Sequence, residues 1–237
     1  MSATRDMERD NDIHLFLVSE KCVMSPKFHT KFSLAGKLQR YHVTYTFSSV
    51  TPGSVGNRRV FSDIENGDWY LKSEIKLVPV NWKTRRPTKF PKTFYENTCK
   101  LIDNEHMPMI TRRQEALIPP DISFKTSVQT RYSDMDFNLH VSYAEYYRFS
   151  CDAAAEASLS GYYRHFNSDI VNYPILQTEA TFLGECGPEE LLLVYTWQDE
   201  KDLEKIYFAI YLKDVRIFQA CFIYDNKKSH DHVMSSL

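Results

Sequence analysis

The stretch TRYSDMDFNLHVSYAEYYRFSCDAAA, from Thr130 to Ala155, decides how the second half of the chain folds. Its first residues are typical of the end of a strand, and the segment Ser133–Asp136, with a serine and two aspartates, predicts a sharp turn. A helix is expected to begin between Asn138 and Ser142 and to run to about Ser158. Acidic and amide side chains suit this position because they cap the free N–H groups of a first helical turn and complement the helix dipole.

Three polar side chains in this stretch alternate with apolar ones: Asp136, Asn138 and His140. The simplest interpretation is capping and packing, because a lone carboxylate before a helix is usually a cap. A carboxylate, an amide and an imidazole beside free backbone N–H groups are also the parts that polarise a carbonyl and direct water at it. The residues alone leave both interpretations open, whereas Asp134 is expected to be structural.

The segment SDMDFNLHV (Ser133–Val141) resembles the helix start of hotdog-fold thioesterases. The closest resemblance is to plant and bacterial acyl-acyl carrier protein (acyl-ACP) thioesterases, which carry Asp-x-Asn-x-His followed by Val. Two further segments match that family in the same order. NWKTRRPTKFP (Asn81–Pro91) is similar to the strand exit of its first domain, and GECGP (Gly184–Pro188) to its Glu-Cys-Gly segment. The resemblance extends from about Lys37 to Tyr224.

The resemblance implies hydrolysis of an acyl thioester served by five residues. Asp136 would act as a base or nucleophile or would orient its neighbours, and Asn138 would hold the thioester or a water. His140 would assist proton transfer or position the carbonyl, which is expected against backbone N–H groups near His140–Ser142. Glu185 would activate the water. Cys186 aligns with a cysteine once counted as a nucleophile, but an unassisted thiol is mostly protonated at neutral pH, so packing is its alternative role.

Three features depart from the family pattern. Ser142-Tyr143 stands where the family usually has two asparagines that secure the helix start, and Leu139 replaces a more polar residue. The stretch between the helix and Glu185 is also longer than in the plant enzymes. Each departure can shift the substrate class. The first also motivates an alternative function, that of a non-catalytic acyl-thioester-binding hotdog protein.

Composition limits the classes of partner. The 237 residues suit one large domain or two small ones, and 29 basic against 31 acidic residues leave the chain near neutrality. Because no basic stripe is evident, no nucleic-acid partner is expected. The five cysteines are scattered, which argues against a disulfide framework or a zinc site and favours a reducing compartment; they are Cys22, Cys99, Cys151, Cys186 and Cys221. No cofactor is expected.

The sequence favours a cytosolic location. No apolar run approaches the length that spans a membrane, so no membrane span is expected. The start, MSATRDMERDND, leads to no signal-type apolar core and is too acidic for a typical transit peptide. The ending Ser-Ser-Leu lacks the middle basic residue of a peroxisomal address.

Alternating apolar residues and turn residues predict strands in both halves. In the first half they are expected at 39–47, 57–64 and 69–80, with a hairpin turn at Asn66-Gly67. Residues 13–24 fit a helix stripe and a strand face, and 28–34 are expected to form a short strand. In the second half, a strand at 123–132 precedes the helix, and strands at 175–185, 191–199, 205–212 and 215–224 follow it. The helix face expected against the sheet is Ala144, Tyr147, Cys151, Ala154 and Ser158.

The two halves repeat a similar order of strands, which indicates an internal duplication. A strand, a long helix and an antiparallel run of strands form an α+β layout with the sheet wrapped around the helix. The resemblance implies a tandem, or double, hotdog. The first hotdog is incomplete, because no clear opening strand and long helix precede residue 38. The expected domains are an N-terminal hotdog-like domain at 13–98, a linker at 99–120 and a C-terminal hotdog domain with the catalytic motif at 121–226.

The resemblance implies a fatty acyl thioesterase of fatty acid biosynthesis that acts on acyl-ACP or acyl-CoA. Both carriers present the same phosphopantetheine arm, and no feature of the sequence distinguishes them. Arg85, Arg86, Lys89 and Lys92 form a charge run that faces either an acidic carrier or only solvent. A hotdog dehydratase lacks support because no hydratase-type motif is present. The incomplete first half leaves surface for a second copy, so a homodimer is one expected assembly.

Overall fold

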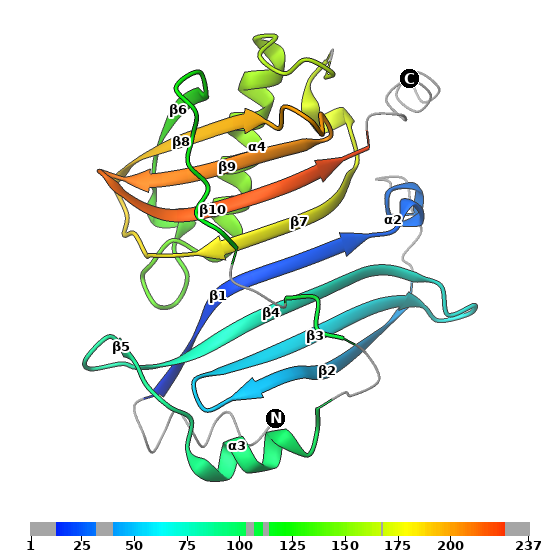
Figure 1. Cartoon of the computed structure of the whole chain (residues 1–237), viewed down its shortest axis with the longest axis vertical. Coiled ribbons are helices and arrows are strands. Elements are labelled where there is room, and N and C mark those ends of the chain that lie inside the picture. The colour runs from blue at the N-terminus through cyan, green and yellow to red at the C-terminus, as the bar shows by residue number, and fades with distance from the viewer. Residues whose placement is uncertain (1–12, 32–39, 103–106, 111–113, 167, 226–237) are drawn as a thin grey trace. The chain divides into compact units, whose positions relative to one another are not determined.

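The computed structural model describes residues 13–31, 40–102, 107–110, 114–166 and 168–225 (Figure 1). The chain divides into two compact units, residues 1–113 and 114–237. The division lies within the predicted linker, 99–120. The outer limits of the two predicted domains, 13–98 and 121–226, remain predictions.

The second unit is an antiparallel sheet with one long helix against it (Figure 1). Its strands lie in the order β7-β10-β9-β8-β6, so the strand before the helix forms one edge. This arrangement confirms the predicted α+β layout. Its elements are β6 (Phe124–Gln129), the 3-10 turn η1 (Tyr132–Asp134), α4 (Tyr143–Leu159), the 3-10 turn η2 (Ile170–Asn172), β7 (Ile175–Phe182), β8 (Leu191–Gln198), β9 (Lys205–Leu212) and β10 (Val215–Tyr224).

Helix α4 lies close to the sheet because its buried face is built from small residues and two aromatic rings. Ala154 and Ala157 are fully buried, and Tyr146 and Phe149 are 3% and 1% exposed. The predicted face was therefore partly wrong, since Ala144 is exposed and Tyr147 and Cys151 lie only at its border. Burying a large aromatic side chain removes far more apolar area from water than burying an alanine methyl. The helix is therefore oriented with its aromatic residues, rather than Ala144, toward the sheet.

The core of the second unit fills the space between α4 and the strands. The Tyr146 ring stacks on Phe218 of β10 with ring centroids 5.3 Å apart. Inward-facing strand residues alternate with outward-facing ones, as period-two strands require. Those with no more than 1% exposure include Leu192, Val194, Ile206, Phe208, Ile210, Phe218, Ala220 and Phe222.

The first unit is also an antiparallel sheet, with the order β2-β3-β4-β1 and β5 paired to β4. Residues 13–24, which fitted two patterns, form a strand. The short strand expected at 28–34 was wrong for the described part, because Pro26–Lys31 are helical and a proline favours the first position of a helix. The elements are β1 (Ile13–Met24), α2 (Pro26–Lys31), β2 (Tyr41–Thr51), β3 (Ser54–Asp63), β4 (Trp69–Asn81), β5 (Arg86–Pro87) and α3 (Lys92–Cys99).

The order of strands in the first unit repeats four of the five strands in the second. β1-β4-β3-β2 corresponds to β7-β10-β9-β8, so β1 matches the strand that follows the long helix. Counterparts of β6 and α4 do not occur among the described residues of the first unit, which confirms an incomplete first hotdog. Helix α3 instead packs against this sheet, with Phe94 beside the buried Val55 and Phe90.

None of the helices in the described part of the chain is long and apolar enough to cross a bilayer.

Buried polar side chains tie residues of the predicted linker to each unit. In the first unit Glu74 of β4, 1% exposed, accepts the N–H groups of Met109 (3.0 Å) and Ile110 (3.2 Å) and pairs with Arg58 at 3.3 Å. In the second unit Gln219 of β10, also 1% exposed, accepts the N–H of Leu117 at 3.1 Å and donates to the carbonyl of Glu115 at 2.7 Å. Each unit therefore anchors its own part of the connection.

Replacing Glu74 with alanine is expected to lower the free energy of unfolding of the first unit by about 3–5 kcal/mol, because the buried Arg58 guanidinium and the N–H groups of Met109 and Ile110 would lose their shared acceptor. Denaturation followed by tryptophan fluorescence measures the change. Glu96→Ala is the control: its carboxylate is 54% exposed and pairs with Lys92, so it should change stability by less than about 1 kcal/mol. Equal effects of the two substitutions would contradict the anchoring role of Glu74.

Candidate functional site

The motif residues form a small hairpin before α4. Met135 and Val141 pair as an isolated antiparallel bridge. The N–H of Asp136 donates to the carbonyl of His140 (2.9 Å), and the N–H of Leu139 donates to the carbonyl of Asp136 (3.0 Å). These bonds close a three-residue hairpin loop, Phe137–Leu139, whose third residue is left-handed with φ 61°. The helix itself begins at Tyr143, one residue beyond the predicted window.

Asp136 and Asn138 interact within this hairpin. Oδ1 of Asp136 accepts the N–H of Asn138 at 2.8 Å, and Nδ2 of Asn138 lies 3.4 Å from Oδ2 of the same carboxylate. The carboxylate therefore caps the hairpin loop rather than the helix, as aspartates do in Asx turns. Both residues are half-buried, so their side chains keep contact with solvent.

The second motif segment lies directly against the hairpin. The N–H of Val141 donates to the carbonyl of Cys186 at 3.0 Å, although 45 positions separate the two residues in the sequence. This bond sets Glu185 beside His140, and His140 Nε2 lies 3.6 Å from Glu185 Oε2. The two side chains are 29% and 37% exposed. The hairpin thus carries Asp136 and Asn138 together with the His140–Glu185 pair on one local framework.

Cys186 faces the interior of the unit. Its residue is 3% exposed, and its Sγ lies 3.4 Å from the hydroxyl of the buried Tyr146. Burial raises the pKa of the Cys186 thiol to about 11, and burial also raises the pKa of Tyr146. At neutral pH the sulfur is therefore a neutral thiol, which suits a wall of the site better than a nucleophile.

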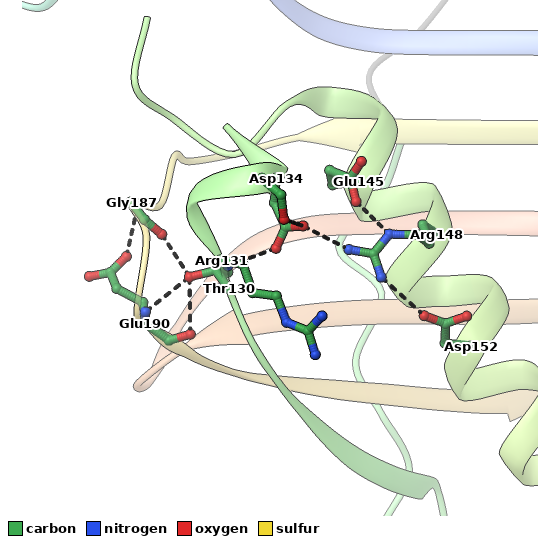
Figure 2. Close-up of polar contacts among 9 residues, drawn as sticks. Thr130, Arg131, Asp134, Glu145, Arg148, Asp152, Gly187 and Glu190 are labelled. Atoms are coloured by element: carbon green, nitrogen blue, oxygen red, sulfur yellow. Dashed lines mark hydrogen bonds and ion pairs between the residues drawn. The ribbon is translucent and has the colours of Figure 1, made fainter. Parts of the chain in front are cut away.

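A buried carboxylate fixes the hairpin to the helix. Asp134 is 5% exposed, and its side chain accepts the N–H of Arg131 (2.7 Å) and a guanidinium N–H of Arg148 (3.0 Å). Its carbonyl accepts the N–H of Ser142 at 2.8 Å. Figure 2 shows the Arg148 guanidinium between Asp134 and two further carboxylates of α4, Glu145 and Asp152. Asp134 is structural in this arrangement, as the sequence predicted.

A threonine joins the strand before the hairpin to the Gly187–Glu190 turn (Figure 2). Thr130 Oγ1 donates to the carbonyl of Gly187 at 2.8 Å and accepts the N–H of Glu190 at 2.9 Å. Glu190 Oε2 in turn accepts the N–H of Gly187 at 2.9 Å. Sequence reasoning missed Thr130, Arg148 and Glu190. The only local signal was the three-residue spacing of Gly187 and Glu190, which is common in turns.

The backbone donors at the helix start differ from the expected ones. The N–H groups of Val141 and Ser142 already donate within the protein, so two of the three residues proposed to bind the carbonyl cannot do so without breaking these bonds. Ser142 occupies the cap position without a side-chain cap bond. Within the described hydrogen bonds, the first-turn N–H groups of Tyr143 and Ala144 have no acceptor. These two groups are the available donors at the positive end of a 17-residue helix.

Comparison with solved structures gives the fold. The 12:0-ACP thioesterase from Umbellularia californica matches with a TM-score of 0.73 at 13% identity, over 93% of this chain and 76% of that chain. An acyl-ACP thioesterase from Bacteroides thetaiotaomicron matches with a TM-score of 0.69 at 12% identity, over 93% and 80% of the two chains. No protein-family model matches the sequence, and neither does any curated protein. The chain therefore has the double-hotdog fold that its motifs predicted.

Replacing Asp134 with alanine should destabilise the second unit by about 2–3 kcal/mol, because a buried charge-assisted network would lose its acceptor. Asp152→Ala is the matched control. Asp152 also pairs with Arg148, but its side chain is 63% exposed and its oxygen lies 3.5 Å away, so we expect less than about 1 kcal/mol. Urea denaturation of both variants measures the difference, and a larger loss in the Asp152 variant would refute the assignment.

Cys186 should react with iodoacetamide at least about a hundredfold more slowly than the exposed Cys99 between neutral pH and pH 8. The raised pKa keeps the thiol protonated below pH about 11, and the reactive thiolate forms only as the pH rises through that value. Mass spectrometry of timed samples measures both rates in the same molecule. Fast alkylation of Cys186, with loss of turnover in Cys186→Ala, would restore a nucleophilic role.

Proposed function

We propose that the protein hydrolyses fatty acyl thioesters, carried by ACP or CoA, to a free fatty acid and a thiol. The observation that carries this proposal is the pair of His140 and Glu185, 3.6 Å apart, held beside the Asp136–Asn138 hairpin at the start of α4. A carboxylate and an imidazole in contact can take a proton from water and return it to a leaving group. The helix start offers backbone donors for a developing oxyanion.

In the proposed reaction the thioester carbonyl accepts hydrogen bonds from the N–H groups of Tyr143 and Ala144. Glu185 takes a proton from a water molecule, and the water oxygen attacks the carbonyl carbon. Negative charge on the carbonyl oxygen of the tetrahedral intermediate is stabilised by the two N–H groups and the helix dipole. When the carbon–sulfur bond breaks, the leaving thiolate takes up a proton through His140, which contacts Glu185.

Asp136 and Asn138 support this chemistry from the hairpin. The Asp136 carboxylate already accepts from the backbone and side chain of Asn138, which favours an orienting role over attack on the substrate. Asn138 would then hold the thioester or the water with its remaining hydrogen-bonding groups. Cys186 would form part of the wall. Direct action of Asp136 as base or nucleophile is the alternative that the same variants test.

The carrier of the acyl group is proposed from the compared structures and from surface charge. The two solved structures compared above are named as ACP thioesterases, which supports an acyl-ACP substrate and a place in fatty acid biosynthesis. The exposed charge run of Arg85, Arg86, Lys89 and Lys92 suits an acidic carrier protein. CoA carries the same phosphopantetheine arm as ACP, so acyl-CoA is also a proposed substrate. All five cysteines are free thiols, which supports a cytoplasmic setting, and the incomplete first hotdog supports a homodimer.

A non-catalytic acyl-thioester-binding protein is the second candidate. The observation in its favour is that Val141 and Ser142 have their N–H groups occupied and that Ser142 makes no side-chain cap bond. Such a protein would bind the thioester and release no thiol.

Free-thiol release from acyl-ACP and acyl-CoA panels tests the proposal. Asp136→Asn and Glu185→Gln should each lower kcat/KM by at least about a hundredfold, because each removes a carboxylate from the site while preserving its shape. Glu200→Gln, an exposed carboxylate in the β8–β9 loop of the same unit, should leave turnover unchanged. Turnover that survives in both site variants would mean that the chemistry lies elsewhere. A wild-type protein that binds acyl thioesters and releases no thiol would favour the binding protein.

A further inference from the structure

The tip of the motif hairpin is apolar and faces solvent. Phe137 is 91% exposed and Leu139 is 73% exposed, whereas the polar residues around them, Asp136, Asn138 and His140, are half-buried. Single exposed apolar residues are common on proteins. Here two large exposed apolar side chains lie on one three-residue loop, in the same segment as the proposed catalytic groups. We refer to Phe137 and Leu139 together as the hairpin tip.

Leu139 occupies a backbone position that its side chain disfavours. The third residue of a three-residue hairpin loop is left-handed, and glycine is the usual choice there because it lacks a Cβ. Leu139 has φ 61°. The other non-glycine residues with positive φ in the described part of the chain are charged: Arg85, Glu189 and Lys213. Leu139 therefore combines an unfavourable conformation with an unfavourable exposure.

Burial within the described protein does not offset this conflict, because both tip side chains remain largely exposed. Residues that keep a disfavoured backbone conformation, without stabilising contacts in the folded chain, occur most often at functional positions. An apolar ligand that covers the tip when bound would supply the missing compensation.

We propose that Phe137 and Leu139 contact the acyl chain of the thioester substrate and select for long chains. This inference rests on the proposed function and deepens it. Phe137 adjoins Asp136 and Leu139 adjoins His140 in the sequence, so the tip is the apolar surface next to the proposed catalytic groups on the same hairpin. Of the substrate's two arms, pantetheine carries amides that need hydrogen-bond partners, and the tip side chains offer none. The alkyl chain is the arm that an apolar tip can bind.

The hairpin also explains how specificity and chemistry are kept separate. Asp136 and His140 are joined by a backbone hydrogen bond at the base of the loop, and this bond uses no atom of the tip side chains. Changing the tip should therefore alter contact with the alkyl chain while leaving the base in place.

Binding of S-alkyl-pantetheine thioethers, which share the arm of both carriers and cannot be hydrolysed, tests the inference by calorimetry. For the double variant Phe137→Ser/Leu139→Asn, we expect the affinity for the dodecyl thioether to fall by about ten- to a hundredfold and that for the ethyl thioether by less than about twofold. The same chain-length dependence is expected in kcat/KM for lauroyl-CoA against acetyl-CoA. The Leu139→Asn variant should unfold at the same or a higher temperature, because asparagine tolerates the left-handed conformation.

Two control variants separate this effect from general ones. Leu159→Ser removes an apolar side chain that is 68% exposed at the far end of α4, and it should leave both affinities unchanged. Lys213→Gly relieves the positive φ of 56° in the β9–β10 turn without touching the hairpin, and it should also leave them unchanged.

Three other outcomes would overturn the inference, and a fourth would support it while refuting hydrolysis. Equal losses for both thioethers would mean that the tip only shapes the hairpin. Unchanged thioether binding, with a change in sedimentation or in binding to phosphatidylcholine vesicles, would assign the tip to a second copy or to a lipid surface. A wild-type protein that binds no thioether also overturns it. Chain-length-dependent binding without any thiol release would support the tip assignment and refute hydrolysis.

Discussion

The geometry of the candidate site depends on one buried carboxylate, that of Asp134. Its oxygens bind the backbone at Arg131 and the guanidinium of Arg148, and its carbonyl binds the N–H of Ser142. The end of the strand, the hairpin and the first turns of α4 are therefore fixed to one another at a single residue. A charge removed from water is tolerated only when it is paired and hydrogen-bonded, and Asp134 meets both conditions. The His140–Glu185 contact follows from this arrangement through the bond between Val141 and Cys186.

Local patterns predicted most of the fold. Strands β9 and β10 have the predicted limits, and Gly67 has the positive φ of 73° that the Asn-Gly turn requires. These features depend on alternation and turn chemistry within a few residues. The prediction failed where tertiary packing decides: the buried face of α4 follows its aromatic residues, and residues 28–31 of the strand expected at 28–34 belong to the helix Pro26–Lys31.

The candidate site was predictable in part. Asp136, Asn138 and His140 lie within five positions, and the resemblance to a known family added Glu185 and Cys186. The structure sets His140 beside Glu185, while the catalytic roles remain proposed. The supporting contacts between distant segments had no pattern to reveal them, because Thr130 meets Gly187 across 57 positions and Arg148 meets Asp134 across 14. Nor could composition show that Val141 and Ser142 use their N–H groups, since backbone pairing between distant segments leaves no residue signature.

The asymmetry between the two units has a consequence for how the chain can evolve. Two equal hotdogs would each present a long helix start, but the described residues contain one such start, in the second unit. The residues proposed for the chemistry all lie in the second unit, so the described part of the first unit is constrained chiefly by its own folding and by the surfaces that it offers. Substitutions in the first unit that preserve its sheet would therefore leave the residues of the proposed site in place, so that unit would be the freer of the two to diversify.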